Sequence, residues 1–219
     1  PGFDMGCEEC GAEGSTLRAV VETTRSGELQ LRVVVMIPCD DGYDCITSRE
    51  VVRFENCWAM YNGYGPKFEK HGDGNGFKVG GYGNTQQQAV PNPAPRHVTE
   101  GCLAVRNRSS GFYANHHLMG GDWSYNSAYR NSNDFNFLMR PPDNSADIDG
   151  VGHRIIGNLS YRGNRDVTKL DAAKCDLKEN AFATEGMRLR ATEDIQFFDE
   201  MWRAFDVDKS NDIDREEFT

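Results

Sequence analysis

The residues with the clearest capacity for chemistry are three aspartates and one lysine in the first half of the chain. The aspartates are Asp40, Asp41 and Asp44, and Lys78 stands 34 positions after the last of them. Three carboxylates held together repel one another unless a cation neutralises them, and calcium accepts irregular sets of oxygen ligands. A lysine beside a bound divalent cation loses part of its proton affinity, so its neutral amine could act as a base. The alternative is an acidic turn with an unrelated surface lysine.

These side chains can meet only if the backbone stacks distant segments, and a repeated pattern predicts such stacking. The pattern is a turn residue, an aromatic residue, a variable residue and a short run into a strand. Its copies are Gly2-Phe3-Asp4-Met5, Gly42-Tyr43-Asp44-Cys45-Ile46, Gly76-Phe77-Lys78-Val79-Gly80, Gly111-Phe112-Tyr113-Ala114-Asn115 and Asp134-Phe135-Asn136-Phe137-Leu138. The last four copies are spaced by 34, 35 and 23 residues.

A second pattern is interleaved with the first. Its copies are Asn56-Cys57-Trp58-Ala59-Met60-Tyr61-Asn62, Gly101-Cys102-Leu103-Ala104-Val105-Arg106-Asn107, Tyr125-Asn126-Ser127-Ala128-Tyr129-Arg130-Asn131 and Gly157-Asn158-Leu159-Ser160-Tyr161-Arg162-Gly163. A small residue, alanine or serine, holds the same place in every copy. This regularity indicates a second column of equivalent positions.

Repeats of unequal length around a constant core are typical of a β-solenoid. In that fold each coil adds one strand to each of several parallel sheets. Sixteen of the 23 glycines lie between Gly63 and Gly163, a composition that disfavours long helices. Asparagine at the corners can pair its side-chain amide with the coils above and below, and it tolerates unusual backbone angles. We therefore predict a solenoid, and the alternative is an irregular β-sandwich with chance similarity between segments.

In a solenoid, equivalent residues of successive coils lie about 4.8 Å apart. The variable residues then form one column, Asp4, Asp44, Lys78, Tyr113 and Asn136. The residues before each turn residue form a neighbouring column, Pro1, Asp41, Asn75, Ser110 and Asn133. This register brings Asp40, Asp41 and Asp44 within one coil of Lys78, and it favours a calcium site with a lysine base over the acidic turn.

The stretch before the first acidic turn departs from the coil pattern. Apolar residues alternate from Leu29 to Ile37, which predicts a strand. This strand can pair with residues 16–23 through Arg25-Ser26-Gly27 as a hairpin.

A second candidate calcium site ends the chain. Residues 206–217 fit the twelve-residue EF-hand loop, with side-chain ligand positions at Asp206, Asp208, Ser210, Asp214 and Glu217 and the backbone-carbonyl position at Asp212. Only Phe218 and Thr219 follow, so the printed sequence holds no exiting helix. The alternative is an acidic C-terminal cap of the solenoid.

The overall charge excludes one class of partner and leaves another open. With 24 basic and 34 acidic residues the formal net charge is −10, which argues against a nucleic-acid binder. An acidic protein can still hold an anionic polymer if a divalent cation lies between them. No run approaches 18 consecutive apolar residues, so we expect no membrane span.

Several ordered blocks resemble polysaccharide lyase family 9, the pectate lyases. They include Cys39-Asp40-Asp41-Gly42-Tyr43-Asp44, residues 52–63, Gly74-Asn75-Gly76-Phe77-Lys78-Val79-Gly80-Gly81, residues 111–117, residues 126–131, Gly157-Asn158-Leu159-Ser160-Tyr161 and Asp171-Ala172-Ala173-Lys174-Cys175. The resemblance covers residues 39 to 183 and implies an all-β, right-handed parallel β-helix. It also implies calcium-assisted β-elimination of polygalacturonate.

The resemblance assigns roles residue by residue. Asp40, Asp41 and Asp44 would be calcium ligands and Lys78 the catalytic base. The family's fourth aspartate comes from the preceding coil, where this chain has Pro1, so Asp4 from the adjacent column is the substitute. Tyr113 and Asn136 would line the sugar groove, or they are exposed solenoid residues without a ligand.

We therefore expect a calcium-dependent lyase, secreted and monomeric, that acts on polygalacturonate or a related uronic-acid polysaccharide. The expected organisation is an N-terminal segment (1–38), a β-helix catalytic domain (39–195) and a short helical or loop tail with the EF-hand-like loop (196–219). The alternative is a non-catalytic calcium-binding β-solenoid, an adhesion or carbohydrate-binding module. Lys78 separates the two, because elimination needs a base and binding does not.

Overall fold

The structure is a computed structural model of the 219-residue chain. It describes residues 40–65, 68–82, 91–141 and 145–182, and the backbone of 16–23 and 29–36. The chain divides into two units at Ala183, and all the described residues belong to the first unit. The expected ligand Asp4 and the EF-hand-like loop at 206–217 lie outside the described residues, and so does the tail from residue 183.

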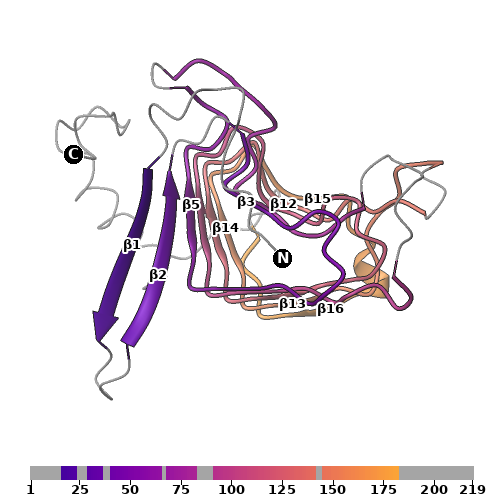
Figure 1. Cartoon of the computed structure of the whole chain (residues 1–219). Helices are drawn as coiled ribbons and strands as arrows, with labels where there is room; N and C mark the ends of the chain where they lie inside the picture. The colour runs from indigo at the N-terminus through magenta and orange to yellow at the C-terminus, as the bar shows by residue number, and fades with distance from the viewer. Residues whose placement is uncertain are drawn as a thin grey trace. The chain divides into compact units, whose positions relative to one another are not determined.

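In the first unit the backbone winds through three sheets in turn, as the view along the coils in Figure 1 shows. Sheet B carries the first repeated pattern, in β3 (Tyr43–Asp44), β6 (Phe77–Lys78), β9 (Ser110–Tyr113), β12 (Asn133–Asn136) and β15 (Arg165–Thr168). Sheet C consists of β4 (Arg53–Glu55), β7 (Val98–Glu100), β10 (Asp122–Ser124), β13 (Arg154–Ile156) and β16 (Asp176–Lys178).

Sheet A carries the second repeated pattern, in β5 (Trp58–Met60), β8 (Leu103–Val105), β11 (Ser127–Tyr129) and β14 (Leu159–Tyr161). Neighbouring strands in all three sheets pair in parallel, apart from one hairpin. The fold is therefore an all-β parallel β-helix, as predicted, and the β-sandwich alternative is wrong. The one helical element of the described residues is a 3-10 turn, η1 (Ala172–Lys174), and none of their helices could span a membrane.

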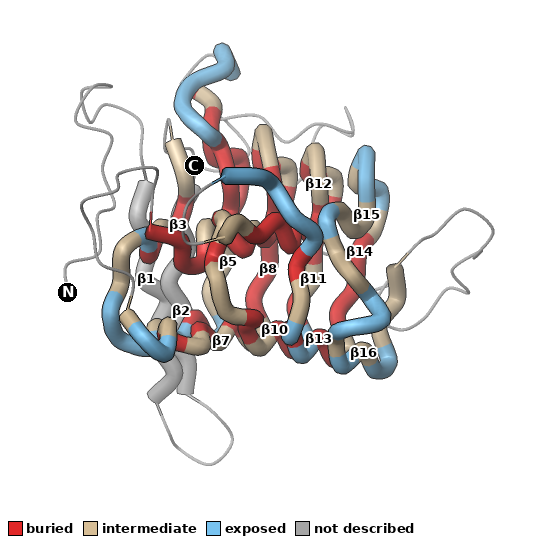
Figure 2. Tube along the Cα trace, turned by 90° about the vertical axis from the view of Figure 1, so that its right-hand side faces the viewer, coloured by how far each residue is buried: buried red, intermediate tan, exposed pale blue. Residues whose placement is uncertain are grey.

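The predicted register is confirmed at both patterns. In sheet B, Phe77 pairs with Tyr43 and with Phe112, which in turn pairs with Phe135. The four rings stack inside the helix with successive centroid distances of 4.7, 5.0 and 4.9 Å. In sheet A the small residues stack in the same way, in the order Ala59, Ala104, Ala128 and Ser160. Figure 2 shows this buried interior running along the stacked strands.

Asparagine side chains tie the coils together at the corner between sheets A and B. Asn62 Nδ2 donates to Asn107 Oδ1 at 2.7 Å, and Asn107 Nδ2 donates to Asn131 Oδ1 at 2.9 Å. A second ladder joins sheets C and A, in which Asn126 Nδ2 donates to Asn158 Oδ1 and Asn158 Nδ2 to Asn180 Oδ1, both at 3.0 Å. The amides pair between coils as the sequence predicted.

The first ladder explains the glycine in the first pattern. A Cβ atom on Gly76 would lie 2.7 Å from Asn107 Nδ2, and one on Gly42 would lie 2.4 Å from Asn62 Nδ2. The ladder amide therefore needs a residue without a side chain beside it. Asp134 breaks this rule in the fourth coil, where its own carboxylate ends the ladder by accepting a hydrogen bond from Asn131 Nδ2 at 2.9 Å.

The predicted N-terminal hairpin is also confirmed. Strands β1 (Thr16–Thr23) and β2 (Leu29–Met36) pair antiparallel over eight residues each. Strand β2 then pairs in parallel with β5, with Val35 opposite Ala59. The hairpin therefore extends sheet A beyond the first coil, a connection that the sequence patterns do not predict.

Candidate active site

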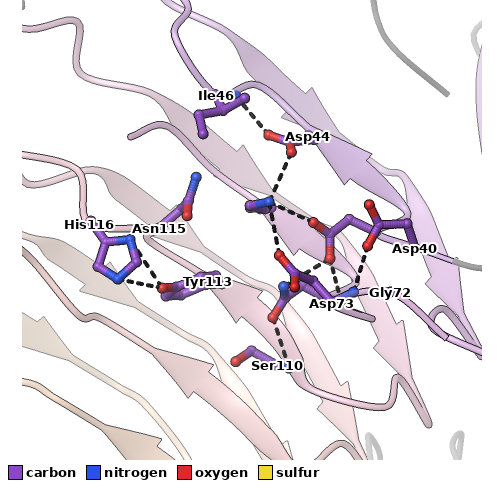
Figure 3. Close-up of polar contacts among 12 residues, drawn as sticks. Asp40, Asp44, Ile46, Gly72, Asp73, Ser110, Tyr113, Asn115 and His116 are labelled. Carbon is purple, nitrogen blue, oxygen red and sulfur yellow. Dashed lines mark hydrogen bonds and ion pairs between the residues drawn. The ribbon is translucent and has the colours of Figure 1, made fainter. Parts of the chain in front are cut away.

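The predicted aspartates and lysine lie together on the outer face of sheet B. Side chains alternate across a strand, so the core positions Tyr43 and Phe77 leave Asp44 and Lys78 outside, opposite each other in register. Lys78 Nζ lies 3.0 Å from Asp41 Oδ2 and 3.2 Å from Asp44 Oδ2. Figure 3 shows this cluster, with Asp40 and Asp44 on either side of it.

Asp73 is a fourth carboxylate in the cluster, and the sequence patterns missed it. Asp73 Oδ2 lies 3.3 Å from Lys78 Nζ, and the Asp73 backbone N–H donates to Asp40 Oδ1 at 2.6 Å. One oxygen each from Asp40, Asp41 and Asp73 lies within 4.8 Å of the others. Asp73 belongs to the loop that leads into β6, outside both repeats. An acidic residue five positions before Lys78 was the one available signal.

Asp41 and Asp44 each use one oxygen for anchoring and turn the other toward Lys78. Asp41 Oδ1 accepts hydrogen bonds from the backbone N–H and the side-chain Nδ2 of Asn75, at 2.7 and 2.8 Å. Asp44 Oδ1 accepts from the Ile46 backbone N–H at 2.7 Å. These hydrogen bonds therefore fix the Asp41 and Asp44 carboxylates, and the second oxygen of each points to Lys78 Nζ.

The charges of this cluster shift the pKa values of its members. Burial raises the pKa of the Asp41 carboxyl above its usual range, although the positive charge of Lys78 opposes this effect. For Lys78, burial lowers the pKa, but the charges of Asp41 and Asp44 outweigh burial and hold it above its ordinary value. The lysine is therefore an ammonium in this arrangement and acts as the cation among the carboxylates.

The donor set fits a divalent cation such as calcium. All four side chains offer carboxylate oxygens, the ligand type that calcium prefers. Oxygens of Asp41, Asp44 and Asp73 already surround one positive charge, the Lys78 ammonium. Asp40 is grouped with Asp41 and Asp73, with one oxygen of each within 4.8 Å of the others. Asp41 is only 3% exposed at its side chain, so its charge needs a cationic partner. Asp40, Asp41, Asp44 and Asp73 are the residues that would hold the ion.

The two expected groove residues differ in their contacts. Tyr113 pairs with Lys78 in register, one coil further along sheet B, and its hydroxyl lies 3.0 Å from His116 Nε2 (Figure 3). Asn136 follows in the next coil, opposite Tyr113. Asn136 Oδ1 accepts from the Leu138 backbone N–H at 3.2 Å and so also supports its own turn. His116 was not predicted, because it lies outside the repeated column.

Comparisons with known proteins agree with this fold. The family model described as "Pel9A-like, right handed beta helix region" matches residues 32–158, more than half of the chain. The chain therefore belongs to the Pel9A-like right-handed β-helix family, and its coils have the handedness expected from the sequence resemblance.

Named proteins are similar to part of this chain. Pectate lyase L of Dickeya chrysanthemi is 34% identical over 135 residues, which cover 61% of this chain and 28% of that protein. Pectate lyase L of Dickeya dadantii (strain 3937) is 33% identical over the same shares of the two chains. A solved rhamnogalacturonan lyase matches with a TM-score of 0.64 and 33% identity, over 74% of this chain and 41% of that one. The chain thus spans less than half the length of these relatives.

Proposed function

We propose that this protein is a polysaccharide lyase that cleaves polygalacturonate, or a related uronic-acid polymer, by calcium-dependent β-elimination. The observation that carries this proposal is the convergence of Asp41, Asp44 and Asp73 on Lys78 at the outer face of sheet B, with Asp40 grouped beside Asp41 and Asp73. The names of its relatives, pectate lyase and rhamnogalacturonan lyase, support the same reaction class and two related substrates. The remaining predictions, a secreted and monomeric protein, belong to the same proposal.

In this proposal the four carboxylates bind the calcium ion and so orient the substrate. Calcium held by them would also engage the uronate carboxylate and make the adjacent C5 proton more acidic. Asp41 and Asp44 are anchored by Asn75 and Ile46, so their inward oxygens keep their positions when a substrate arrives. The Asp41 side chain is itself only 3% exposed to water.

Lys78 is the base in this proposal. Its amine must be neutral to accept the C5 proton, and burial already favours the neutral form. The opposing effect comes from the charges of Asp41 and Asp44, which a cation bound to the same carboxylates would offset. Removal of the C5 proton then lets the C4–O4 bond break and leaves a 4,5-unsaturated sugar at the new non-reducing end.

A cation between protein and polymer also accounts for the charge of the chain. The protein has a formal net charge of −10 and its proposed substrate is a polyanion. Without a cation, long-range repulsion would slow their encounter.

The test is to incubate the 219-residue protein with polygalacturonate, with rhamnogalacturonan and with a neutral galactan, each with calcium or with a chelator. We expect ultraviolet-absorbing unsaturated product from a uronate polymer, only with calcium. Binding of polygalacturonate without any unsaturated product would instead support the non-catalytic module. Equal product formation in the chelator would contradict the calcium requirement.

A further inference from the structure

We propose that Tyr113, oriented by His116, donates the proton that the leaving O4 oxygen needs when the glycosidic bond breaks. This inference rests on the proposed lyase function and assigns the acid that complements the Lys78 base. It comes from the placement of two side chains for which the sequence patterns offered no catalytic role.

Tyr113 lies one strand away from the proposed base. Tyr113 in β9 pairs in register with Lys78 in β6, and both side chains point to the outer face of sheet B. Paired parallel strands lie about 4.8 Å apart. In β-elimination the proton leaves C5 and the bond breaks at the neighbouring C4, so base and acid must act on adjacent atoms. Neighbouring outward positions on one sheet meet that requirement.

The tyrosine hydroxyl is held by a histidine in an unusual backbone conformation. His116 Nε2 lies 3.0 Å from the Tyr113 hydroxyl, and the two rings meet edge to face with centroids 5.6 Å apart. Both Asn115 and His116 have positive φ angles, 49° and 61°, as do ten other non-glycine residues of the described chain. A non-glycine residue adopts this region at a cost, and such strain persists only where surrounding contacts enforce it.

Those enforcing contacts are present. Asn115 Nδ2 donates to the Gly80 carbonyl at 2.7 Å, and the His116 backbone N–H donates to the Leu138 carbonyl at 3.0 Å. The bend turns the imidazole back over the outer face of sheet B, toward the phenol of Tyr113 (Figure 3). These contacts hold the bend that places a ring nitrogen at this hydroxyl.

The protonation states suit a donor. Burial raises the pKa of Tyr113 to about 12, so the phenol keeps its proton at neutral pH. Burial also lowers the pKa of His116, with the charge of Arg140 acting in the same direction and that of Asp147 opposing it. A neutral imidazole can still donate one N–H hydrogen bond to the tyrosine oxygen. The other charged groups that influence this pair are Lys78 and Asp73.

Base and acid each transfer one proton in the elimination. The Lys78 amine takes the C5 proton, the C5–H electron pair forms the C4=C5 bond, and the C4–O4 bond breaks. The Tyr113 hydroxyl proton moves to O4, and the phenolate that forms accepts a hydrogen bond from the His116 N–H. The phenolate then regains a proton from solvent, and the Lys78 ammonium releases one. His116 is a positioning residue, because it acts through the tyrosine.

The test compares two leaving groups. The 219-residue protein, Tyr113→Phe and His116→Asn are assayed with calcium on oligogalacturonate and on a uronide whose O4 carries a 4-nitrophenyl group. A nitrophenolate leaves without a proton, so the acid is needed only for the sugar. We expect Tyr113→Phe to lose about 100-fold in kcat on oligogalacturonate with little change in KM, and to stay within about threefold on the aryl substrate. His116→Asn should show the same selectivity with a smaller loss.

The matched control is Tyr125→Phe, at an exposed position between β10 and β11, and it should keep full activity. An active wild-type protein with Tyr113→Phe within twofold on oligogalacturonate would overturn the inference. Equal losses on both substrates would also overturn it, because they indicate a binding or folding role. If the wild-type protein forms no unsaturated product from either substrate, the lyase proposal itself fails and the acid role fails with it.

Discussion

Lys78 distinguishes the hypothesis of a lyase from that of a non-catalytic calcium-binding module. Its ammonium contacts three carboxylates in this structure, so it competes with any cation for the same oxygens. Calcium binding therefore has to displace or neutralise an internal ion pair. The two hypotheses predict different effects of removing the amine.

We expect Lys78→Ala to lose elimination activity and to bind calcium at least as tightly as the wild type. The loss in kcat should be on the order of 100- to 10,000-fold, the usual contribution of a positioned base. Affinity should not fall, because the variant lacks the competing ammonium. Steady-state kinetics and calorimetric calcium titration measure the two effects. Lys178→Ala on β16, an exposed lysine paired with Asp176, is the control. Unchanged product formation in Lys78→Ala would rule out the lysine as the base.

Asp73 tests whether a loop residue completes the cation site. Asp73→Asn keeps the size of the side chain and the backbone hydrogen bond to Asp40, but it removes one charge next to the cluster. We expect calcium affinity to fall on the order of 10- to 100-fold, the size of effect that follows loss of a group that tunes a metal site.

The measurement is calorimetric titration of calcium in a Glu217→Gln background, which weakens the EF-hand-like loop predicted at 206–217. Asp176→Asn, a carboxylate on β16 in sheet C, serves as the matched charge control. Calcium affinity that is equal in Asp73→Asn and Asp176→Asn would exclude Asp73 from the site.

At the scale of the strands and their corners, the asparagine ladders depend on the glycines beside them. Asn107 hydrogen-bonds to Asn62 and Asn131 and also donates to the Ala59 carbonyl at 3.1 Å. Gly76 supplies the space in which that amide lies. The turn glycine of the first pattern is thus required by its neighbour in the adjacent coil, since the ladder amide leaves no room for a Cβ atom.

Gly76→Ala should therefore destabilise the protein strongly. Its Cβ would lie 2.7 Å from Asn107 Nδ2 and 2.7 Å from the Gly111 carbonyl oxygen, and the Asn107 amide cannot move without breaking its ladder bonds. We expect a loss of about 3 kcal/mol in the free energy of unfolding, from overpacking and broken hydrogen bonds. Urea denaturation measures it.

Gly152→Ala separates crowding from backbone strain. Gly152 has φ +69°, but nothing lies within 4 Å of its added Cβ. Only the conformational cost of about 1 kcal/mol remains for that variant. Similar losses in Gly76→Ala and Gly152→Ala would mean that the ladder does not demand the glycine.

At the scale of the whole molecule, buried titratable groups set the response to acid. His97 and His153 are 1% and 2% exposed, and burial lowers the pKa of each to about 4. Their Nδ1 atoms accept backbone N–H groups, from Val52 at 3.1 Å and from Gly121 at 2.9 Å. Protonation of either Nδ1 would replace an accepted hydrogen bond with a clash of two donors.

The sign of the pH effect follows from these shifts. An unfolded histidine titrates near pH 6.5, so between pH 6.5 and 4 the unfolded chain binds more protons and stability falls as pH falls. Asp134 acts in the opposite direction, because burial raises its pKa to about 6 and the folded protein gains protons first between pH 6 and about 4. Of these three groups, the two histidines destabilise the fold on acidification and Asp134 stabilises it.

We expect the free energy of unfolding to decrease between pH 7 and pH 5, with a contribution of about 2 kcal/mol from each of the two histidines. Asp134→Asn preserves an acceptor for the Asn131 amide but removes the opposing titration, so its stability should fall more steeply over the same range. Urea titrations of both proteins at four pH values test this. A flat profile, or a shallower one in Asp134→Asn, would show that these groups do not control acid stability.

The sequence by itself determined the stacking of the coils. A strand buries every second side chain and parallel coils place equivalent residues side by side, so the recurring aromatic and small residues specify which positions pair. Phe77 with Phe112, Ala104 with Ala128 and Asp44 with Lys78 follow from that spacing. The hairpin of β1 and β2 was also predictable from alternation, because its pairing is local.

Only the tertiary structure decided what lies between the repeated positions. Asp73 and His116 occupy a loop and a bend that no repeat covers, and their directions depend on contacts with Asp40 and Leu138 of neighbouring coils. The pairing of β2 with β5 is equally non-local. Periodicity fixes register because it recurs in every coil, whereas a single loop conformation is selected by packing that occurs once.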